Sequence, residues 1–147
     1  MTKAMVKDAI TYLQCELVAQ RNLVNPEEIS WLQFDILLKL SQTDHMLPSD
    51  LCISLGISRV KLAKSLKKLK QQNYIIQNRS DNDGRALLTK ISDNGLVLLQ
   101  KIYIGHDNLA QIVDETLNQE EQELFIQLAN RLSEALKSRR IKSEERD

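Results

Sequence analysis

The feature that most constrains the fold is the tetrapeptide Leu55-Gly56-Ile57-Ser58, which lies between two short amphipathic segments. Glycine readily adopts the left-handed conformation that closes a helix, so we expect Gly56 to end a short helix that begins at Pro48. A serine hydroxyl can accept a hydrogen bond from a free backbone N–H group, so Ser58 is expected to cap the next helix. Two helices joined by a turn of about three residues form a helix-turn-helix.

The second of these helices, predicted from Arg59 to about Gln72, has one apolar and one cationic face. The residues expected to pack on the apolar side are Leu62, Ala63, Leu66 and Leu69. The opposite side carries Val60, Lys61, Lys64, Lys67 and Lys68, with Ser65 at its margin. A solvated surface helix normally mixes Glu with Lys, whereas this one contains no acidic residue. We therefore interpret it as a helix that faces phosphate groups, the alternative being an ordinary solvated charged helix.

Charge is strongly segregated within a chain that is neutral as a whole, with 20 basic and 20 acidic residues. Residues 58–90 contain nine Lys and Arg but only two acidic residues, Asp81 and Asp83, a net charge of +7 that leaves −7 on the rest. One cationic surface on an otherwise acidic protein is the electrostatic pattern of a protein that binds a polyanion.

The segments that precede the helix-turn-helix are predicted to be two helices. Between about residues 2 and 22, an apolar stripe at helical spacing is formed by Val6, Ile10, Leu13 and Leu17. The second helix, which ends near Ser41, begins either at Ser30, where Ser30 and Gln33 fit a capping box, or at Asn25-Pro26-Glu27.

The segments that follow are predicted to be a β-hairpin and two further helices. Tyr74–Gln77 and Ala86–Ile91 are β-prone and flank the turn-forming Ser80–Gly84. Ser92 is expected to cap a long helix that reaches about Glu115, and 118–121 to cap a last one. The apolar stripe of that last helix is Phe125, Leu128, Leu132 and Leu136. The whole order predicts a mainly α fold with a small β-hairpin wing, that is, a winged helix-turn-helix.

The chain resembles the multiple antibiotic resistance regulator (MarR) family of bacterial transcription factors over nearly its whole length. The residues that carry the resemblance are Leu51 and Leu55-Gly56-Ile57-Ser58-Arg59, Leu66-Lys67-Lys68-Leu69, Tyr74-Ile75, Asp83-Gly84-Arg85, and Ile91-Ser92 with Gly95. The most specific of these are in the wing, where Asp83, Arg85, Ser92 and Gly95 match the family pattern. Gly84 departs from this pattern, since many members carry a second Arg there.

The resemblance implies a homodimer that binds double-stranded DNA at a pseudo-palindromic operator, most often as a repressor. It implies an N-terminal dimerisation helix and connection in residues 1–30, a winged DNA-binding lobe in 31–91, and a long helix with a C-terminal dimerisation helix in 92–147. The DNA-binding residues expected on this basis are Ser58, Arg59, Val60, Lys61, Lys64, Ser65, Lys68, Asp83 and Arg85. Control by a small apolar or phenolic ligand, bound between the dimer helices and the lobe, is also implied.

Other classes of function find little support. His45 and His106 stand alone, without Cys or His at metal-ligand spacing, and the sequence has no glycine-rich phosphate loop. We therefore expect no enzymatic activity, no metal site and no cofactor. Six aromatic residues are few for a protein that stacks single-stranded RNA, and Trp31, Phe34 and Phe125 are interpreted as core. The remaining alternative is a winged helix that binds a protein partner, although protein interfaces are usually depleted of Lys.

The N-terminus and the cysteines indicate a soluble, cytoplasmic protein without a membrane partner. Lys3, Lys7 and Asp8 interrupt the first ten residues, which therefore do not resemble a signal peptide. The two cysteines, Cys15 and Cys52, are expected to be reduced thiols. Some members of the resembled family sense peroxides through a cysteine in the first helix, so Cys15 is either such a sensor or a buried or half-buried thiol.

Overall fold

The structure is a computed structural model that describes residues 2–24, 29–79 and 87–146, the last three by their backbone only. Its elements are α1 (Lys3–Leu23), α2 (Trp31–Ser41), α3 (Pro48–Leu55), α4 (Arg59–Gln71), β1 (Ile75–Arg79), β2 (Leu87–Ile91), α5 (Asp93–Ile104), α6 (Asp107–Thr116) and α7 (Gln119–Arg146). This order confirms the predicted fold class, a mainly helical winged helix-turn-helix.

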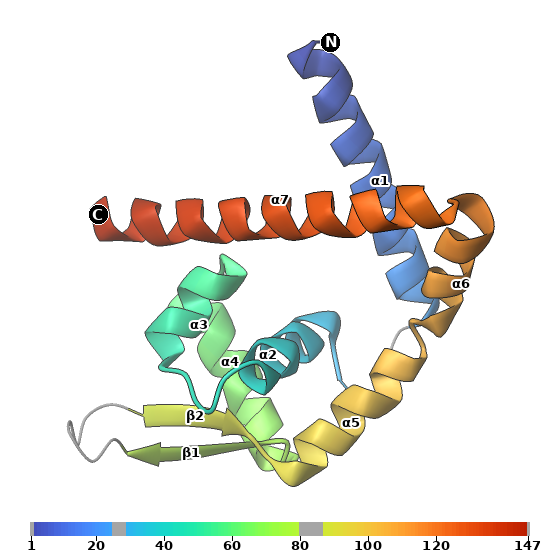
Figure 1. Ribbon diagram of the computed structural model, residues 1–147. Coiled ribbons are helices and arrows are strands. Elements are labelled where there is room, and N and C mark those ends of the chain that lie inside the picture. The colour runs from blue at the N-terminus through green and yellow to red at the C-terminus, as the bar shows by residue number, and fades with distance from the viewer. Residues whose placement is uncertain (1, 25–28, 80–86, 147) are drawn as a thin grey trace.

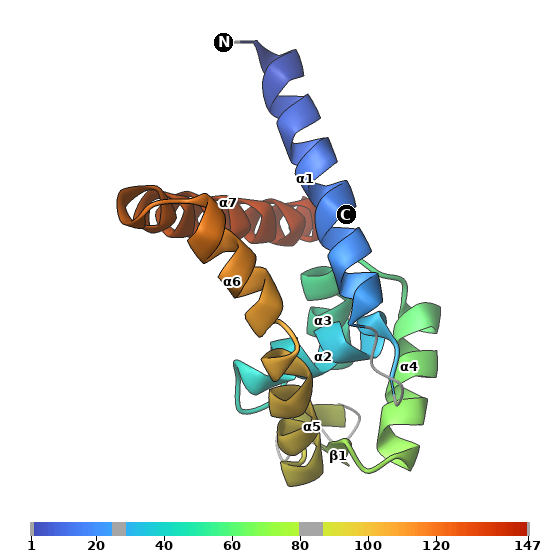
Figure 2. The ribbon, with the colours of Figure 1, turned by 90° about the vertical axis from the view of Figure 1, so that its right-hand side faces the viewer.

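The helices α2, α3 and α4 and the hairpin form a lobe from which the other helices project (Figure 1). Helix α1 and the pair α5 and α6 leave the lobe on the same side, the right in Figure 1, and α6 leads to α7, which crosses over α3. Figure 2 shows that α1 and α6 both rise from the lobe, whereas α7 runs across above it. The molecule is therefore a winged lobe with helical arms, which are formed by α1 and by α5, α6 and α7.

The core lies where α2, α3 and α4 pack against each other and against the hairpin. Six apolar side chains of these helices are exposed by no more than 1%, and they are Ile36, Leu37, Leu40, Leu51, Leu62 and Leu69. Burial of each such side chain stabilises the fold by roughly 1.5–3 kcal/mol. The apolar face predicted for α4 thus supplies part of the core, except that Ala63, expected on the packed side, is exposed.

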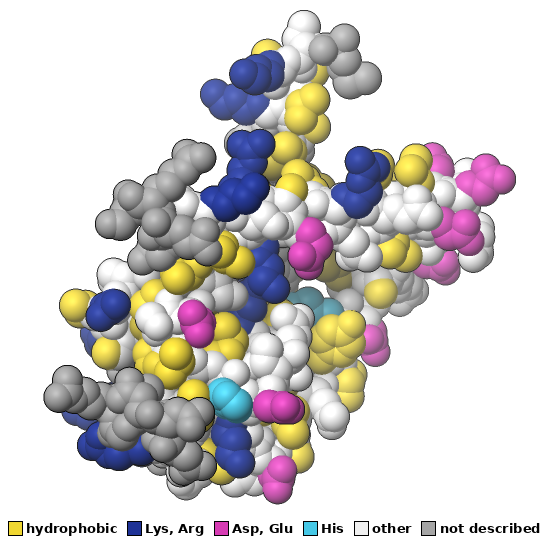
Figure 3. Space-filling model, turned by 60° about the vertical axis from the view of Figure 1, so that its left-hand side comes forward, with side chains coloured by type: hydrophobic (Ala, Val, Ile, Leu, Met, Phe, Trp, Pro, Cys, Tyr) yellow, Lys and Arg dark blue, Asp and Glu magenta, His cyan; other side chains and the backbone are white. Residues whose placement is uncertain are grey.

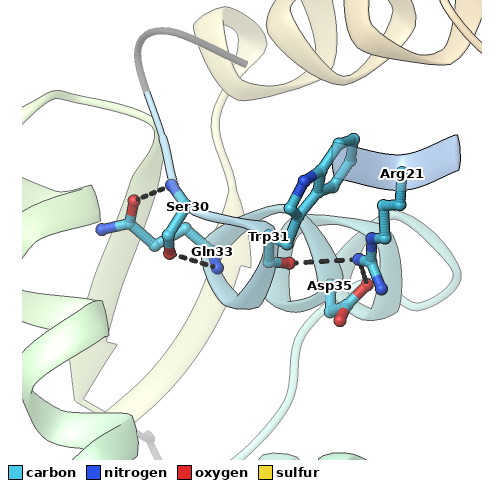
Figure 4. A network of polar contacts seen from close by, with 5 residues as sticks. All are labelled: Arg21, Ser30, Trp31, Gln33 and Asp35. Carbon is cyan, nitrogen blue, oxygen red and sulfur yellow. Dashed lines mark hydrogen bonds and ion pairs between the residues drawn. The ribbon is translucent and has the colours of Figure 1, made fainter. Parts of the chain in front are cut away.

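Local hydrogen bonds set the helix limits as predicted. The capping box of α2 is complete, because Ser30 Oγ accepts from Gln33 N at 3.2 Å and Gln33 Oε1 accepts from Ser30 N at 2.8 Å (Figure 4). The alternative start at Asn25-Pro26-Glu27 lies outside the described residues. Gly56 closes α3 with φ +66°, and Asn118 and Glu121 form a reciprocal cap at the start of α7.

The wing is an antiparallel pair in which Ile75 faces Ile91 and Arg79 faces Leu87. The first strand begins one residue later than predicted and extends two residues further. The loop between α2 and α3 joins this sheet, because Met46 and the fully buried Thr89 exchange two backbone hydrogen bonds of 2.8 Å. The predicted turn at 80–84 lies outside the described residues.

The prediction of one long helix after Ser92 was wrong, because α5 ends at Ile104 and α6 begins at Asp107. The backbone N–H of Gly105 bonds to the carbonyl of Ile102, three residues back, rather than four. Gly105 lies against the end of α1, since a Cβ placed on it would be 2.6 Å from Val24 Cγ1. The close approach of α1 therefore accompanies the break.

The interpretation of Phe125 as a core residue was also wrong, because its side chain is 45% exposed on α7. Phe34 is buried and Trp31 is partly buried against the core, as predicted. The apolar stripes of α1 and α7 find no cover within the described chain, and none of the residues of α1 is buried.

Candidate nucleic-acid interface

Helix α4 presents to solvent the cationic face that the sequence predicts. Leu62, Leu66 and Leu69 are buried, which turns the opposite face outward. The predicted site residues on that face are exposed, namely Ser58, Arg59, Val60, Lys61, Lys64 and Lys68, whereas Ser65 is half-buried. Val60, with 83% of its surface exposed, is an apolar side chain held in solvent among these cations.

The start of α4 combines these side chains with the positive end of a helix. Ser58 Oγ accepts from Lys61 N at 3.2 Å and thereby caps the helix. The first N–H groups of a helix point away from its end and, with the aligned peptide dipoles, attract anions. Arg59, the first residue of α4, therefore adds its charge to an end that already favours phosphate.

The far end of α4 is fixed to the base of the wing by the cap of α5. Asn73 takes the left-handed conformation, with φ +63°, and turns the chain from α4 into β1. Ser92 Oγ donates to the carbonyl of Asn73 at 2.6 Å, and Ser92 N donates to the carbonyl of Tyr74 at 3.0 Å. The orientation of α4 relative to the hairpin is therefore set by contacts between residues distant in sequence.

The structure gives no position for the wing-tip residues of the predicted site. Asp83 and Arg85 lie outside the described residues, between the ends of β1 and β2. The described part of the predicted site is thus the exposed face and N-terminus of α4.

One basic residue that was not predicted as part of the site, Arg140, lies beside this surface. Arg140 of α7 donates from Nη2 to the carbonyl of Ser54, in the last turn of α3, at 3.3 Å. It belongs to a segment, 135–143, that contains four Lys or Arg and no acidic residue. That local charge bias was visible in the sequence, but its proximity to the helix-turn-helix was not.

The acidic residues gather elsewhere on the molecule. Residues 107–123, which form α6 and the start of α7, contain six Asp or Glu and no Lys or Arg. In Figure 3, acidic side chains (magenta) gather toward the right, whereas Lys and Arg side chains (dark blue) gather mainly on the left. The strongest acidic cluster on this face is therefore separate from most of its basic side chains.

The arm formed by α1 is joined to the lobe by Arg21. Its guanidinium forms an ion pair with Asp35 and donates to the carbonyl of Trp31 at 3.3 Å (Figure 4). The same group lies 4.6 Å from the centre of the Trp31 ring, within the range of a cation–π contact. Cys15, in contrast, is exposed on α1 rather than buried, and Arg21 is directed to Asp35.

The described residues also bear on other classes of function. They contain no group of three or more His, Cys, Asp or Glu side chains placed to hold a metal ion. No helix among them combines the length and apolar character that crossing a bilayer requires.

The winged helix-turn-helix fold has counterparts among known proteins. The family model described as the transcriptional regulator SarA/Rot matches residues 22–102, more than half of the chain. The chain belongs to the SarA/Rot family of transcriptional regulators. This membership confirms the prediction of a regulator and assigns the chain to a family of regulators rather than of enzymes.

Relatives of this SarA/Rot family member confirm the resemblance to MarR-type proteins. The transcriptional repressor MprA of Escherichia coli K12 is 27% identical over 124 residues, which are 82% of this chain and 70% of MprA. The regulator PcaV of Streptomyces coelicolor, solved with its natural ligand, has 22% identity and a TM-score of 0.67, covering 86% of this chain and 90% of PcaV. A mutant of E. coli MarR complexed with operator DNA has 18% identity and a TM-score of 0.68, covering 87% and 95%. At these identities the two structures establish the fold.

Proposed function

We propose that the protein is a homodimeric regulator that binds a pseudo-palindromic operator in duplex DNA and acts mainly as a repressor in the cytoplasm, without a cofactor. The observation that carries the proposal is the exposed face of α4, on which Arg59, Lys61 and Lys64 project and no acidic residue occurs. An α-helix fits the major groove, and a winged helix places the start of its second helix there. The operator complex of a MarR protein with the same fold supports this assignment.

The side chains of α4 are proposed to divide between base edges and phosphates. Those nearest the helix N-terminus, Arg59, Val60, Lys61 and Lys64, are placed to reach base edges, and Val60 suits contact with a thymine methyl group. Lys68, in the last turns of the helix, is proposed to contact phosphate, which fixes position without reading sequence. Arg85, oriented by Asp83, is proposed as the wing residue that enters the minor groove.

Dimerisation through residues 1–30 and 92–147 is proposed because α1 and α7 expose large apolar faces. On α1, Val6, Ile10 and Leu13 are each about half exposed, at 48–50%. On α7, Leu128 and Leu132 are exposed to a similar degree, at 48% and 50%. Contiguous apolar surface of this kind on helical arms marks a protein interface. A second copy supplies the complementary arms, and residues 31–91 remain as the DNA-binding lobe.

A small apolar or phenolic ligand is proposed to bind where α1, α2 and the α5–α6 junction meet. A cavity of about 270 Å³ lies there. Its apolar lining includes Leu17, Val24, Phe34 and Leu38, while Arg21 and Asp35 supply polar groups at the same place. The structure of PcaV, which has this fold, with its natural ligand supports a ligand site on the fold.

The first test is binding of the purified protein to the DNA upstream of its own gene, titrated at two salt concentrations. Selective binding that weakens steeply with salt is expected, because each neutralised phosphate releases counterions. Lys64→Ala and Arg85→Ala should weaken binding. Lys101→Ala is the control and should not, because Lys101 is exposed on α5 and lies outside the basic segment 58–90. Equal losses from all three variants would contradict the assignment. Unselective binding with a shallow salt dependence would favour a winged helix that binds a protein partner.

A further inference from the structure

The C-terminal part of α7 lies against the turn between α3 and α4. Figure 1 shows this part of α7 passing over α3. Arg140 is bonded there to the carbonyl of Ser54, and its Cδ is 3.9 Å from the point where a Cβ on Gly56 would lie. A residue of the last helix is thus brought to the start of the helix that is proposed to enter DNA.

A cavity of about 380 Å³ separates this part of α7 from the start of α4. Two guanidinium groups line it from different elements, Arg59 of α4 and Arg140 of α7. Three hydroxyl side chains complete its polar lining, namely those of Ser49, Ser58 and Ser143. None of its described lining residues is acidic, so the cavity is a concave site with two positive charges.

The chemistry of this lining favours a phosphate group. Guanidinium groups bind phosphate through paired, charge-assisted hydrogen bonds, and hydroxyls add further donors. The N-terminus of α4 contributes its dipole at the same place. Within the described residues, Arg140 Nε is buried and has no hydrogen-bond partner. A buried donor without a partner costs about 1–3 kcal/mol, so an acceptor that reached this atom would stabilise the arrangement.

We propose that this cavity is a phosphate site in which Arg140 holds one phosphate, supplied by the backbone of the DNA whose base edges Arg59 reaches from the same lining. The inference rests on the proposed DNA-binding function and extends it to α7, for which the family resemblance implies only dimerisation. In a dimer on two half-sites, each copy of Arg140 neutralises one phosphate. Arg139, also on α7 but outside the cavity lining, provides a neighbouring charge with no such role.

The test compares Arg140→Gln with Arg139→Gln, since each removes one positive charge from α7. Glutamine keeps a polar amide of shorter reach, so the two variants differ only in the position from which the charge is removed. Operator affinity is measured from low to moderate salt for the wild type and both variants. Loss of two phosphate contacts per dimer should reduce the slope of log K against log salt by about 1.8, because each contact contributes about 0.9. Arg139→Gln should leave the slope unchanged.

A purely structural role for Arg140 would lower affinity at every salt concentration and leave the slope as it is, and that result would overturn DNA contact. Equal slope changes in both variants would also overturn it. A second measurement follows thermal unfolding in inorganic phosphate against chloride at matched ionic strength. If phosphate stabilises the wild type but not Arg140→Gln, and the slope of log K against log salt is the same for both, the site binds free phosphate rather than DNA. If the wild type fails to bind DNA selectively, the proposed function fails. The thermal unfolding measurement still shows whether the cavity binds phosphate.

Discussion

Substitution of Gly95 by alanine is expected to destabilise the junction between the wing and α5. Gly95 lies in the first turn of α5, where its backbone N–H donates to Ser92 Oγ at 3.0 Å. A Cβ at this position would lie 2.2 Å from the carbonyl oxygen of Tyr74 and 2.7 Å from Ile91 Cγ1. The carbonyl cannot move freely, because it accepts the backbone hydrogen bond of Ser92 at 3.0 Å.

The size of the effect follows from two opposing contributions. Alanine is favoured over glycine in a helix by about 1 kcal/mol. Forcing an extra carbon into a packed site costs about 1–3 kcal/mol and sometimes more, and the overlap with backbone at Gly95 places this variant at the upper end. We therefore expect a net loss of about 2 kcal/mol in the free energy of unfolding, or roughly 4–8 °C in melting temperature.

Chemical denaturation of Gly95→Ala at a fixed protein concentration measures this loss, because the stability of a dimer depends on concentration. Asn94→Ala is the matched control, since Asn94 is exposed on the same turn and its substitution changes helix propensity without a clash. The control should be neutral or slightly stabilising. A Gly95→Ala variant as stable as the wild type would refute the argument that the carbonyl of Tyr74 requires glycine here.

Three further predictions concern the cap, the arms and the thiol. Ser58→Ala removes the hydroxyl that accepts from Lys61 N and should lower the free energy of unfolding by about 1 kcal/mol; an unchanged value in urea would count against the cap. Leu132→Glu, at a half-exposed position on α7, should convert a dimer into a monomer of intact fold, as measured by light scattering and circular dichroism, whereas an unchanged mass would place the interface elsewhere. If Cys15 is a peroxide sensor, Cys15→Ser should abolish release of the protein from DNA by peroxide, and release equal to that of the wild type would exclude the role.

Local interactions were predictable because their partners lie within a few residues of each other. Ser30, Ser58, Ser92 and Asn118 each cap a helix at the predicted position, through hydrogen bonds to the N–H group three residues ahead. Gly56 closes α3 in the left-handed conformation for an equally local reason. The faces of α4 followed from helical periodicity, since a buried leucine stripe fixes the direction of the lysines.

The features that sequence analysis missed depend on contacts between distant segments. Helical periodicity continues through Gly105, but the end of α1 packs there through Val24 and the helix breaks. Periodicity also identified the apolar stripe containing Phe125 without showing that it stays uncovered within the chain. Arg140 was assigned to the last helix correctly, while its contact with Ser54 depends on how α7 crosses α3.

The arms and the lobe are coupled at two places, which together limit how the proposed dimer can adjust to DNA. At one place, Arg21 joins α1 to α2 through Asp35, beside Val24 and Gly105 at the α5–α6 break. At the other, Arg140 joins α7 to the end of α3, directly before the helix that carries the cationic face. The lobe therefore cannot rotate relative to α1 and α7 without breaking the Arg21–Asp35 or the Arg140–Ser54 contact. The cavity proposed for a ligand lies at the first place and the cavity proposed for phosphate at the second, so occupation of either should bias the same movement of the lobe.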